Sequence, residues 1–121
     1  MSEDKTKQIA ALNDAFRLNF FVPSFGPRPV PGQIVCTRAI SALPPETQIR
    51  IWAAVSSFKD FIEDDIYGEH DFGAFRMEGV PEKIFWKIDY YADKSCTAGS
   101  EDASDPAQCF RLLTIMLASD Y

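Results

Sequence analysis

The sequence is poor in histidine and cysteine, and this shortage excludes several kinds of site. Its 121 residues include one histidine, His70, and three cysteines, Cys36, Cys96 and Cys109, with no Cys-x-x-Cys pair. Neither a zinc finger nor an HExxH zinc site can be built from this set. Three scattered cysteines are also too few for a disulfide framework. We therefore expect reduced, buried cysteines and a cytoplasmic protein.

Long hydrophobic runs and clusters of basic residues are absent too. No apolar stretch approaches the roughly 18 residues that span a bilayer, and residues 1–5 are polar and acidic, unlike a secretory signal. The chain has 12 Lys and Arg against 18 Asp and Glu, so its formal net charge is −6. Because phosphate contacts need clustered Lys and Arg, we expect no direct nucleic-acid binding, and no membrane binding. The glycine-rich and nucleophile motifs of nucleotide-binding proteins and hydrolases are missing as well.

What the sequence does contain is enough apolar residues, 46%, for one hydrophobic core. We expect a single domain over residues 1–121, since single domains usually have about 100–150 residues. Residues 3–19 are predicted to form an amphipathic helix. Its apolar stripe is Ile9, Leu12, Phe16 and Phe20, with Lys5, Lys7, Asp14 and Arg17 outside the stripe.

A proline-rich connector over residues 20–32 separates this helix from the next elements. It holds four of the eight prolines, which favours an extended, stiff conformation. Residues 33–38 are rich in β-branched side chains and predict a short strand. Pro44 and Pro45 then open a second helix, because proline is well tolerated in a first turn. The apolar side of that helix is Ile51, Ala54, Val55, Phe58 and Ile62.

Residues 71–78 and 83–91 predict the two strands of a hairpin joined by residues 79–82. Symmetric pairing about that turn puts three pairs on one face, as a half-buried antiparallel pair requires: Met77 with Ile84, Phe75 with Trp86, and Gly73 with Ile88.

A polar acidic loop over residues 92–104 follows the hairpin, and Asp105 and Pro106 then suit the start of a last helix. The apolar stripe of this helix is Cys109, Phe110, Leu113, Met116 and Leu117. The predicted order is helix, strand, helix, hairpin, helix. This order is typical of the α+β class. We expect a small three-stranded antiparallel sheet, with the first strand paired to the hairpin, packed against about three helices.

Negative charge is concentrated in two segments. Residues 59–71 contain six acids and one lysine, a net charge of −5, and residues 93–105 contain four acids and one lysine, a net charge of −3. The rest of the chain is therefore +2. Because the strands of a hairpin begin and end at the same edge, we expect both segments at one end of the domain. Crowded carboxylates repel one another unless a cation or a basic partner relieves them.

Three interpretations of this acidic end remain open. The first is a solvated surface that only aids solubility. The second is a docking surface for a basic patch on a protein partner, formed by Glu63, Asp64, Asp65, Tyr67, Glu69, His70, Asp71 and Phe72. The third is a divalent cation site, for which the candidate ligands are Glu63, Asp64, Glu69, His70, Asp71 and Asp89. Their spacing does not match an EF-hand.

His70 has two interpretations of its own. A histidine between Glu69 and Asp71 could act as a general acid or base. It could equally be a hydrogen-bonded structural residue that holds the start of a strand. No serine or cysteine nucleophile can be assigned to it from the sequence, so the catalytic residues stay unknown.

Four strings of residues resemble one family. They are Ile9–Arg17 (IAALNDAFR), Glu63–Gly73 (EDDIYGEHDFG), Ile84–Tyr91 (IFWKIDYY) and Leu112–Ala118 (LLTIMLA). Together they are similar, over nearly the whole chain, to the bacterial family called domain of unknown function 3768. The resemblance implies small alphaproteobacterial proteins, often encoded on plasmids and integrated elements near antirestriction and partition genes. It implies no established activity, and the run at residues 22–31 is more proline-dense than the family pattern.

These observations lead to two hypotheses. The leading one is a cytoplasmic, non-enzymatic accessory protein of mobile elements, without a cofactor, whose acidic end binds a basic surface on a host-defence or DNA-processing protein. The alternative is a metal-dependent hydrolase acting on phosphoesters, with a divalent cation held by the segment Glu63–Asp71.

Overall fold

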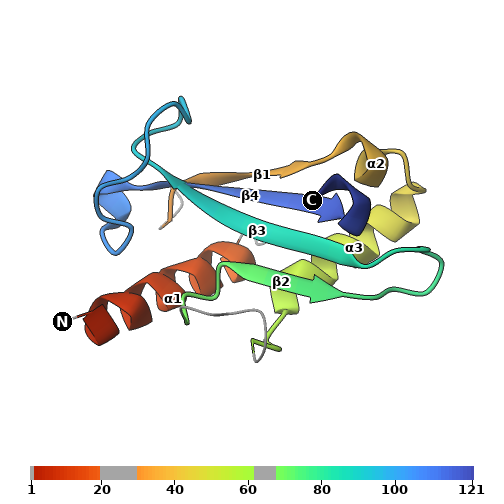
Figure 1. The fold of residues 1–121 in the computed structure, drawn as a ribbon, viewed down its shortest axis with the longest axis horizontal. Helices are drawn as coiled ribbons and strands as arrows, with labels where there is room; N and C mark the ends of the chain where they lie inside the picture. The colour runs from red at the N-terminus through yellow and green to blue at the C-terminus, as the bar shows by residue number, and fades with distance from the viewer. Residues whose placement is uncertain (1, 20–29, 62–67) are drawn as a thin grey trace.

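The computed structural model describes residues 2–19, 30–61 and 68–121. Within these ranges, helices pack on a four-stranded sheet whose strand order is β1-β4-β3-β2 (Figure 1). The α+β class is therefore confirmed. In chain order the elements are α1 (Ser2–Asn19), β1 (Gly32–Cys36), α2 (Arg38–Ser41), α3 (Pro45–Ser57), β2 (Phe72–Phe75), β3 (Ile84–Tyr91), the 3₁₀ helix η1 (Pro106–Gln108), β4 (Phe110–Leu117) and the 3₁₀ helix η2 (Ala118–Asp120).

The sheet is mixed, and the prediction of three antiparallel strands is wrong in two respects. The described residues form four strands, and β1 pairs in parallel with β4 rather than with the hairpin. The antiparallel pairs are β2 with β3 and β3 with β4. The larger part of the predicted connector, residues 20–29, lies outside the described residues, and Gly32 already belongs to β1.

The predicted last helix is the central strand β4. Asp105 does cap a short turn, since its carboxylate accepts a hydrogen bond from the Ala107 N–H, but this turn ends at Gln108. Phe110–Leu117 then runs as an extended strand beside β3. An eight-residue run that is apolar on both faces has no alternation, so periodicity alone does not distinguish it from a buried helix. Its length and its β-branched residues Thr114 and Ile115 favour the strand.

The hairpin forms as predicted but in a register shifted by two residues. Phe75 lies opposite Ile84 and Gly73 lies opposite Trp86. The prediction paired Phe75 with Trp86 and Gly73 with Ile88. Gly79 makes the turn possible, because its φ of 91° lies in a region that favours glycine. The Val80 N–H donates to the Met77 carbonyl and closes the turn. Because the shift is an even number of residues, the predicted inward face is preserved.

Helices α1 and α3 cover one face of the sheet and bury the core there. Phe16 of α1 and Ile51 and Val55 of α3 belong to one cluster with the inward residues of β3 and β4, which include Trp86. Gly73 is required beneath this ring, because a Cβ at that position would collide with the Trp86 indole and with Phe58. Figure 1 shows the loop after β3 and the N-terminal end of α1 at one end of the sheet, with the hairpin turn and α2 at the other. None of the helices within the described ranges is both long and apolar enough to cross a membrane.

Trp86→Ala tests this packing. Trp86 is fully buried, so its removal leaves a large cavity and is expected to lower the free energy of unfolding by about 3–5 kcal/mol. The control is Ile49→Ala, because Ile49 is 69% exposed and its loss should cost less than about 0.5 kcal/mol. Chemical denaturation measures both, and similar losses in the two variants would contradict the observed inward face.

Candidate functional site

Helix α1 carries two polar side chains into the protein interior. Asn13 is fully buried and Arg17 is only 3% exposed. The prediction that Arg17 lies outside the buried stripe is therefore wrong. Residues four apart lie on the same helix face, so Arg17 follows Asn13 towards the sheet. Each of the two side chains is the middle of a hydrogen-bonded cluster between α1 and the rest of the fold: Arg17 of the first polar centre and Asn13 of the second.

The first centre is built around Arg17. Its guanidinium donates to the carbonyls of Val55 (2.8 Å) and Phe58 (2.9 Å) and to the Asp14 carboxylate (2.8 Å). Its Cζ lies 4.8 Å from the centroid of the Trp86 ring, within range of a cation–π contact. Loss of hydration lowers the pKa of Arg17, while the hydrogen bond and the charge of Asp14 oppose that shift. Arg17 thus ties the C-terminal end of α3 to α1.

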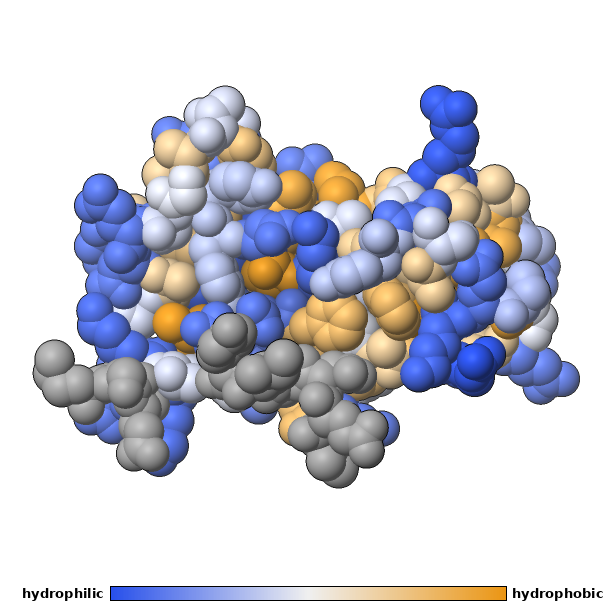
Figure 2. Space-filling view, in the orientation of Figure 1, coloured by the Kyte–Doolittle hydropathy of each residue, from blue (hydrophilic) through white to orange (hydrophobic). Residues whose placement is uncertain are grey.

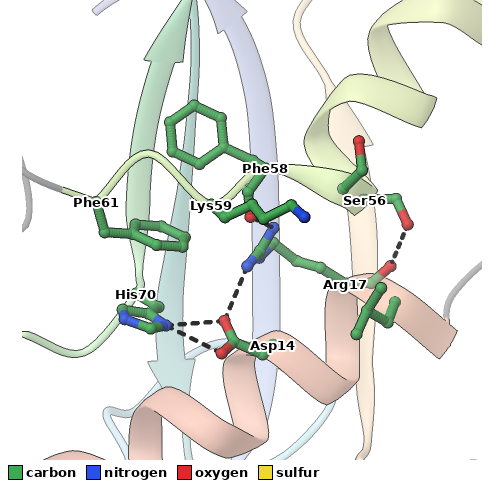
Figure 3. Close-up of a pocket in the computed structure, with 9 residues that line it drawn as sticks. Asp14, Arg17, Ser56, Phe58, Lys59, Phe61 and His70 are labelled. Carbon is green, nitrogen blue, oxygen red and sulfur yellow. Dashed lines mark hydrogen bonds and ion pairs between the residues drawn. The ribbon is translucent and has the colours of Figure 1, made fainter.

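Asp14 also binds His70, and together they form one wall of a pocket (Figure 3). The Nδ1 atom of His70 lies 2.9 and 3.0 Å from the two carboxylate oxygens of Asp14. The imidazole stacks on Phe61, with ring centroids 4.1 Å apart and planes 3° from parallel. His70 has a φ of 57°, an uncommon conformation for a residue with a side chain. The pocket has a volume of about 430 Å³ and opens between α1, the end of α3 and residue 70.

The second centre joins α1 to β3, to β4 and to the segment before β2. The Asn13 amide donates to the Tyr90 hydroxyl (2.8 Å) and to the Glu69 carbonyl (2.9 Å). Its oxygen accepts a hydrogen bond from Arg111 Nε (2.5 Å). The Tyr90 hydroxyl donates in turn to the Glu69 carboxylate (3.0 Å).

Arg111 extends this centre to the acidic loop. The side chain is fully buried, and its Cζ lies 5.2 Å from the centroid of the Tyr90 ring. One terminal nitrogen donates to the carbonyl of Ala103 (2.7 Å), within the loop after β3. Burial lowers the pKa of Arg111, and the groups that oppose this shift include Tyr90 and Glu69. Arg111 therefore holds the loop directly, and the segment at residues 69–71 is joined to Arg111 through Asn13.

The carboxylates of that loop are fixed by hydrogen bonds from the loop itself. Asp93 accepts from Ser95, Asp102 accepts from Ser104, and Asp105 accepts from Ala107 and Gln108. The side-chain donors lower the pKa of each of these three carboxyls most, and the backbone N–H groups lower it further. An aspartate is ionised at neutral pH in any case, and hydrogen bonds to the charged form extend that ionisation to lower pH.

The predicted partner-binding residues fall into three groups. Glu63, Asp64, Asp65 and Tyr67 lie outside the described residues. Glu69 and His70 lie on the helix-covered side, in contact with Tyr90 and Asp14. Asp71 is half-buried, and its carbonyl accepts a hydrogen bond from the Ile88 N–H (2.8 Å). Phe72 lies on the other face of the sheet, against Phe85 and Tyr121.

The described candidate metal ligands do not converge. His70 binds Asp14 on the helix side, whereas Asp89 lies on the opposite face, with its carboxylate 3.1 Å from Lys87 Nζ. Among residues 2–19, 30–61 and 68–121 there is no group of three or more His, Cys, Asp or Glu side chains placed to hold a metal ion.

Chemically, the pocket presents a carboxylate–histidine pair, the first two parts of a general-base arrangement. The nearby hydroxyls already donate to backbone carbonyls, Ser56 to Arg17 (3.0 Å) and Ser57 to Ala53 (2.9 Å). Arg17, Asp14 and His70 are bound to one another or to the backbone. These interactions connect α1, the end of α3 and the segment before β2, which fits a structural role better than a reaction centre.

Sequence reasoning missed three residues of these centres: Asn13, Arg17 and Arg111. Burial on α1 is predicted from its apolar residues alone, so the polar residues Asn13 and Arg17 are not predicted to be buried. Arg111 carried a usable signal, since it is the only charged residue in Phe110–Leu117 and alternates with Leu113 and Ile115.

The comparisons with known proteins identify one family. The family described as "Protein of unknown function (DUF3768)" matches residues 36–120. No curated protein and no solved structure matches the chain significantly.

Asn13→Ala tests the second centre. The change leaves Arg111 Nε and the Tyr90 hydroxyl without this buried partner, and we expect it to lower the free energy of unfolding by about 3 kcal/mol. Gln8→Ala, the same chemical change at an exposed position of α1, should cost less than about 0.5 kcal/mol. Urea denaturation compares the two variants, and equal effects would show that the Asn13 amide stabilises nothing.

Tyr90 predicts a specific dependence of stability on alkaline pH. Burial raises the pKa of the Tyr90 phenol far above its ordinary value of 10.0. Below about pH 10 the phenol is protonated in both states, and the contribution of Tyr90 to stability is fully present. Above that pH the unfolded chain releases the proton and the folded chain does not, so stability falls as pH rises. Unfolding of the wild type and of Tyr90→Phe between about pH 8 and 11 measures this; the advantage of the wild type should shrink with pH, and a constant difference would refute the assignment.

Proposed function

The chain belongs to the DUF3768 family of proteins of unknown function, and we propose that it is a non-enzymatic accessory protein of bacterial mobile elements that binds a basic surface on another protein. The proposed binding surface is the acidic end of the domain. It comprises the loop over residues 92–105 and the neighbouring segment at residues 69–71.

The observation that carries this proposal is the state of the loop carboxylates. Asp93, Asp102 and Asp105 accept hydrogen bonds from their own loop, and these bonds hold the three carboxylates in fixed positions. The contact from a lysine is long, since Lys5 Nζ lies 3.8 Å from Asp102 and is itself 65% exposed. A preformed array of ionised carboxylates attracts a basic partner and orients it during the encounter.

The position of this array supports the same function. Arg111 binds the loop at Ala103, and Asn13 binds the preceding acidic segment at Glu69. Because Asn13 and Arg111 are hydrogen-bonded to each other, the two acidic segments are held at one end of the sheet. Acidic side chains from two separate segments are thereby brought to one end of the sheet, which supports a docking surface there.

The remaining polar groups favour binding over catalysis. The side chains best suited to acid–base catalysis are Asp14, Arg17 and His70. They form interactions that connect α1 to α3 and to the segment before β2. The alternative of a metal-dependent hydrolase gains no support from the described part of the chain, in which no ligand group assembles. We also propose a cytoplasmic location, since Cys36, Cys96 and Cys109 are all free thiols, as in a reducing compartment.

Charge reversal at the acidic end tests the proposal. Asp93→Lys with Glu101→Lys changes two exposed acids of the loop. The control, Glu46→Lys with Glu78→Lys, makes the same change in net charge at two exposed positions at the other end of the sheet. Each tagged chain is used to capture proteins from the native host, and bound proteins are quantified by mass spectrometry with circular dichroism as the folding check.

We expect a protein with a basic surface to be retained by the wild type and the control and to be lost by the loop variant. With that protein purified, the loop variant should bind it at least about tenfold more weakly, and the difference should decrease with added salt. Capture of the same proteins by both double variants would show that the acidic end is not the docking surface.

A further inference from the structure

Strand β4 is mainly apolar on both faces, although the two long helices of the described residues, α1 and α3, cover only one of them. Leu113, Ile115 and Leu117 point into the core beneath α1 and α3. Leu112 and Met116 alternate with them and point to the other face, where Leu112 is half-buried and Met116 is only 4% exposed. Of the described helices, only the short η2 reaches this face, at the end of β4. A sheet with one solvated face usually alternates apolar and polar residues, whereas strands that are apolar on both sides are typical of sheets covered on both sides.

The face opposite α1 and α3 is hollowed over β3 and β4. A groove of about 490 Å³ runs over β3 and β4 between Tyr91 and Tyr121, with Leu112, Thr114 and Met116 along it. Phe72, Phe85 and Tyr121 form an aromatic corner, with ring centroids 5.5–5.9 Å apart. Tyr121 is 72% exposed. Figure 2 shows this face, with apolar atoms in a hollow near its middle and polar atoms around them.

The charges on this face include a self-complementary pair. Lys87 and Asp89 are two residues apart on β3, their side chains are 42% and 39% exposed, and their charged groups lie 3.1 Å apart. A surface with one positive and one negative group side by side matches an inverted copy of itself. Asp120 also lines the groove, and its carboxylate accepts hydrogen bonds from Thr37 and from the Leu117 N–H of the same chain.

We propose that this face binds the same face of a second copy of the chain, forming a two-fold symmetric dimer in which the two sheets stack. Symmetric pairing through one self-complementary patch is the commonest form of protein association. Stacked sheets lie about 10 Å apart, close enough for the side chains of the two faces to interdigitate.

A two-fold axis between the sheets, crossing β3 between residues 87 and 89, satisfies the charges. It places Lys87 of each copy opposite Asp89 of the other copy. It also reverses the strand direction, so the acidic loops come to lie at opposite ends of the dimer. The net charge of −6 on each copy is then separated rather than brought together. The dimer does not depend on the proposed function, because the acidic end remains exposed in both copies.

The first experiment measures the oligomeric state of the full chain. In sedimentation equilibrium between about 1 and 200 µM, the wild type is expected to form dimers. Leu112→Lys, in the middle of the groove, should be a folded monomer. The matched control Ile49→Lys places the same charge on α3 at an exposed apolar residue and should leave the dimer intact. The loop variant D93K/E101K should dimerise like the wild type, which separates this inference from the proposed function.

The second experiment uses the charge pair and does not rely on the Leu112 variant. Lys87→Asp alone and Asp89→Lys alone each place like charges opposite one another and should weaken the dimer at least about tenfold. An equimolar mixture of these two variants should form heterodimers, and K87D/D89K in one chain should restore the homodimer. Thermal melting confirms that each variant is folded.

Three results would overturn the proposal. One is a wild type that stays monomeric over the whole range. Another is a dimer lost with Ile49→Lys but kept with Leu112→Lys, which would place the interface on α3. The third is a monomer whose Leu112→Lys variant loses a captured host protein, which would assign this face to a different partner.

Discussion

The burial of Arg111 constrains most of this structure. An unpaired guanidinium in a protein interior costs several kcal/mol, so its position demands partners. Asn13 of α1, the Ala103 carbonyl of the loop after β3 and the ring of Tyr90 on β3 supply them. These groups are distant in the sequence and cannot satisfy Arg111 unless the helix, the strand and the loop meet at one place. The polar centre therefore specifies how α1 docks on the sheet, which apolar contacts alone would leave less determined.

This constraint also decides where the negative charge lies. The loop at residues 92–105 is attached to the sheet through Ala103, and the segment at residues 69–71 through Glu69. Between these anchor points the aspartates bind their own loop, which holds their charge outward and lowers their pKa. Structural arginines on the inside and ionised carboxylates on the outside are thus two consequences of one arrangement. His70 and Asp14 have a geometry that also occurs in catalytic sites, but here their contact connects α1 to the segment before β2.

The two faces of the sheet carry different information about function. On the helix-covered face the polar groups hold the fold, and the acidic end next to it is the surface that we propose binds a partner. On the other face the half-buried Leu112 of β4 lies in a groove with the ion pair Lys87 and Asp89. An acidic end and a self-complementary sheet face are compatible in one molecule, because stacking through the sheet leaves both acidic loops exposed at opposite ends.

The sequence by itself determined the α+β class, α1, α3, the hairpin and its inward face, since each depends on local spacing, proline positions or alternation. It also determined that few histidines and cysteines are available to bind a metal ion or to form disulfides. Only the tertiary structure decided that Phe110–Leu117 is a strand, because a run apolar on both faces has the same periodicity signal as a buried helix. The burial of Asn13, Arg17 and Arg111 was likewise settled in three dimensions. A polar side chain enters the interior only where partners from distant segments satisfy its hydrogen bonds, and no local pattern records which segments those are.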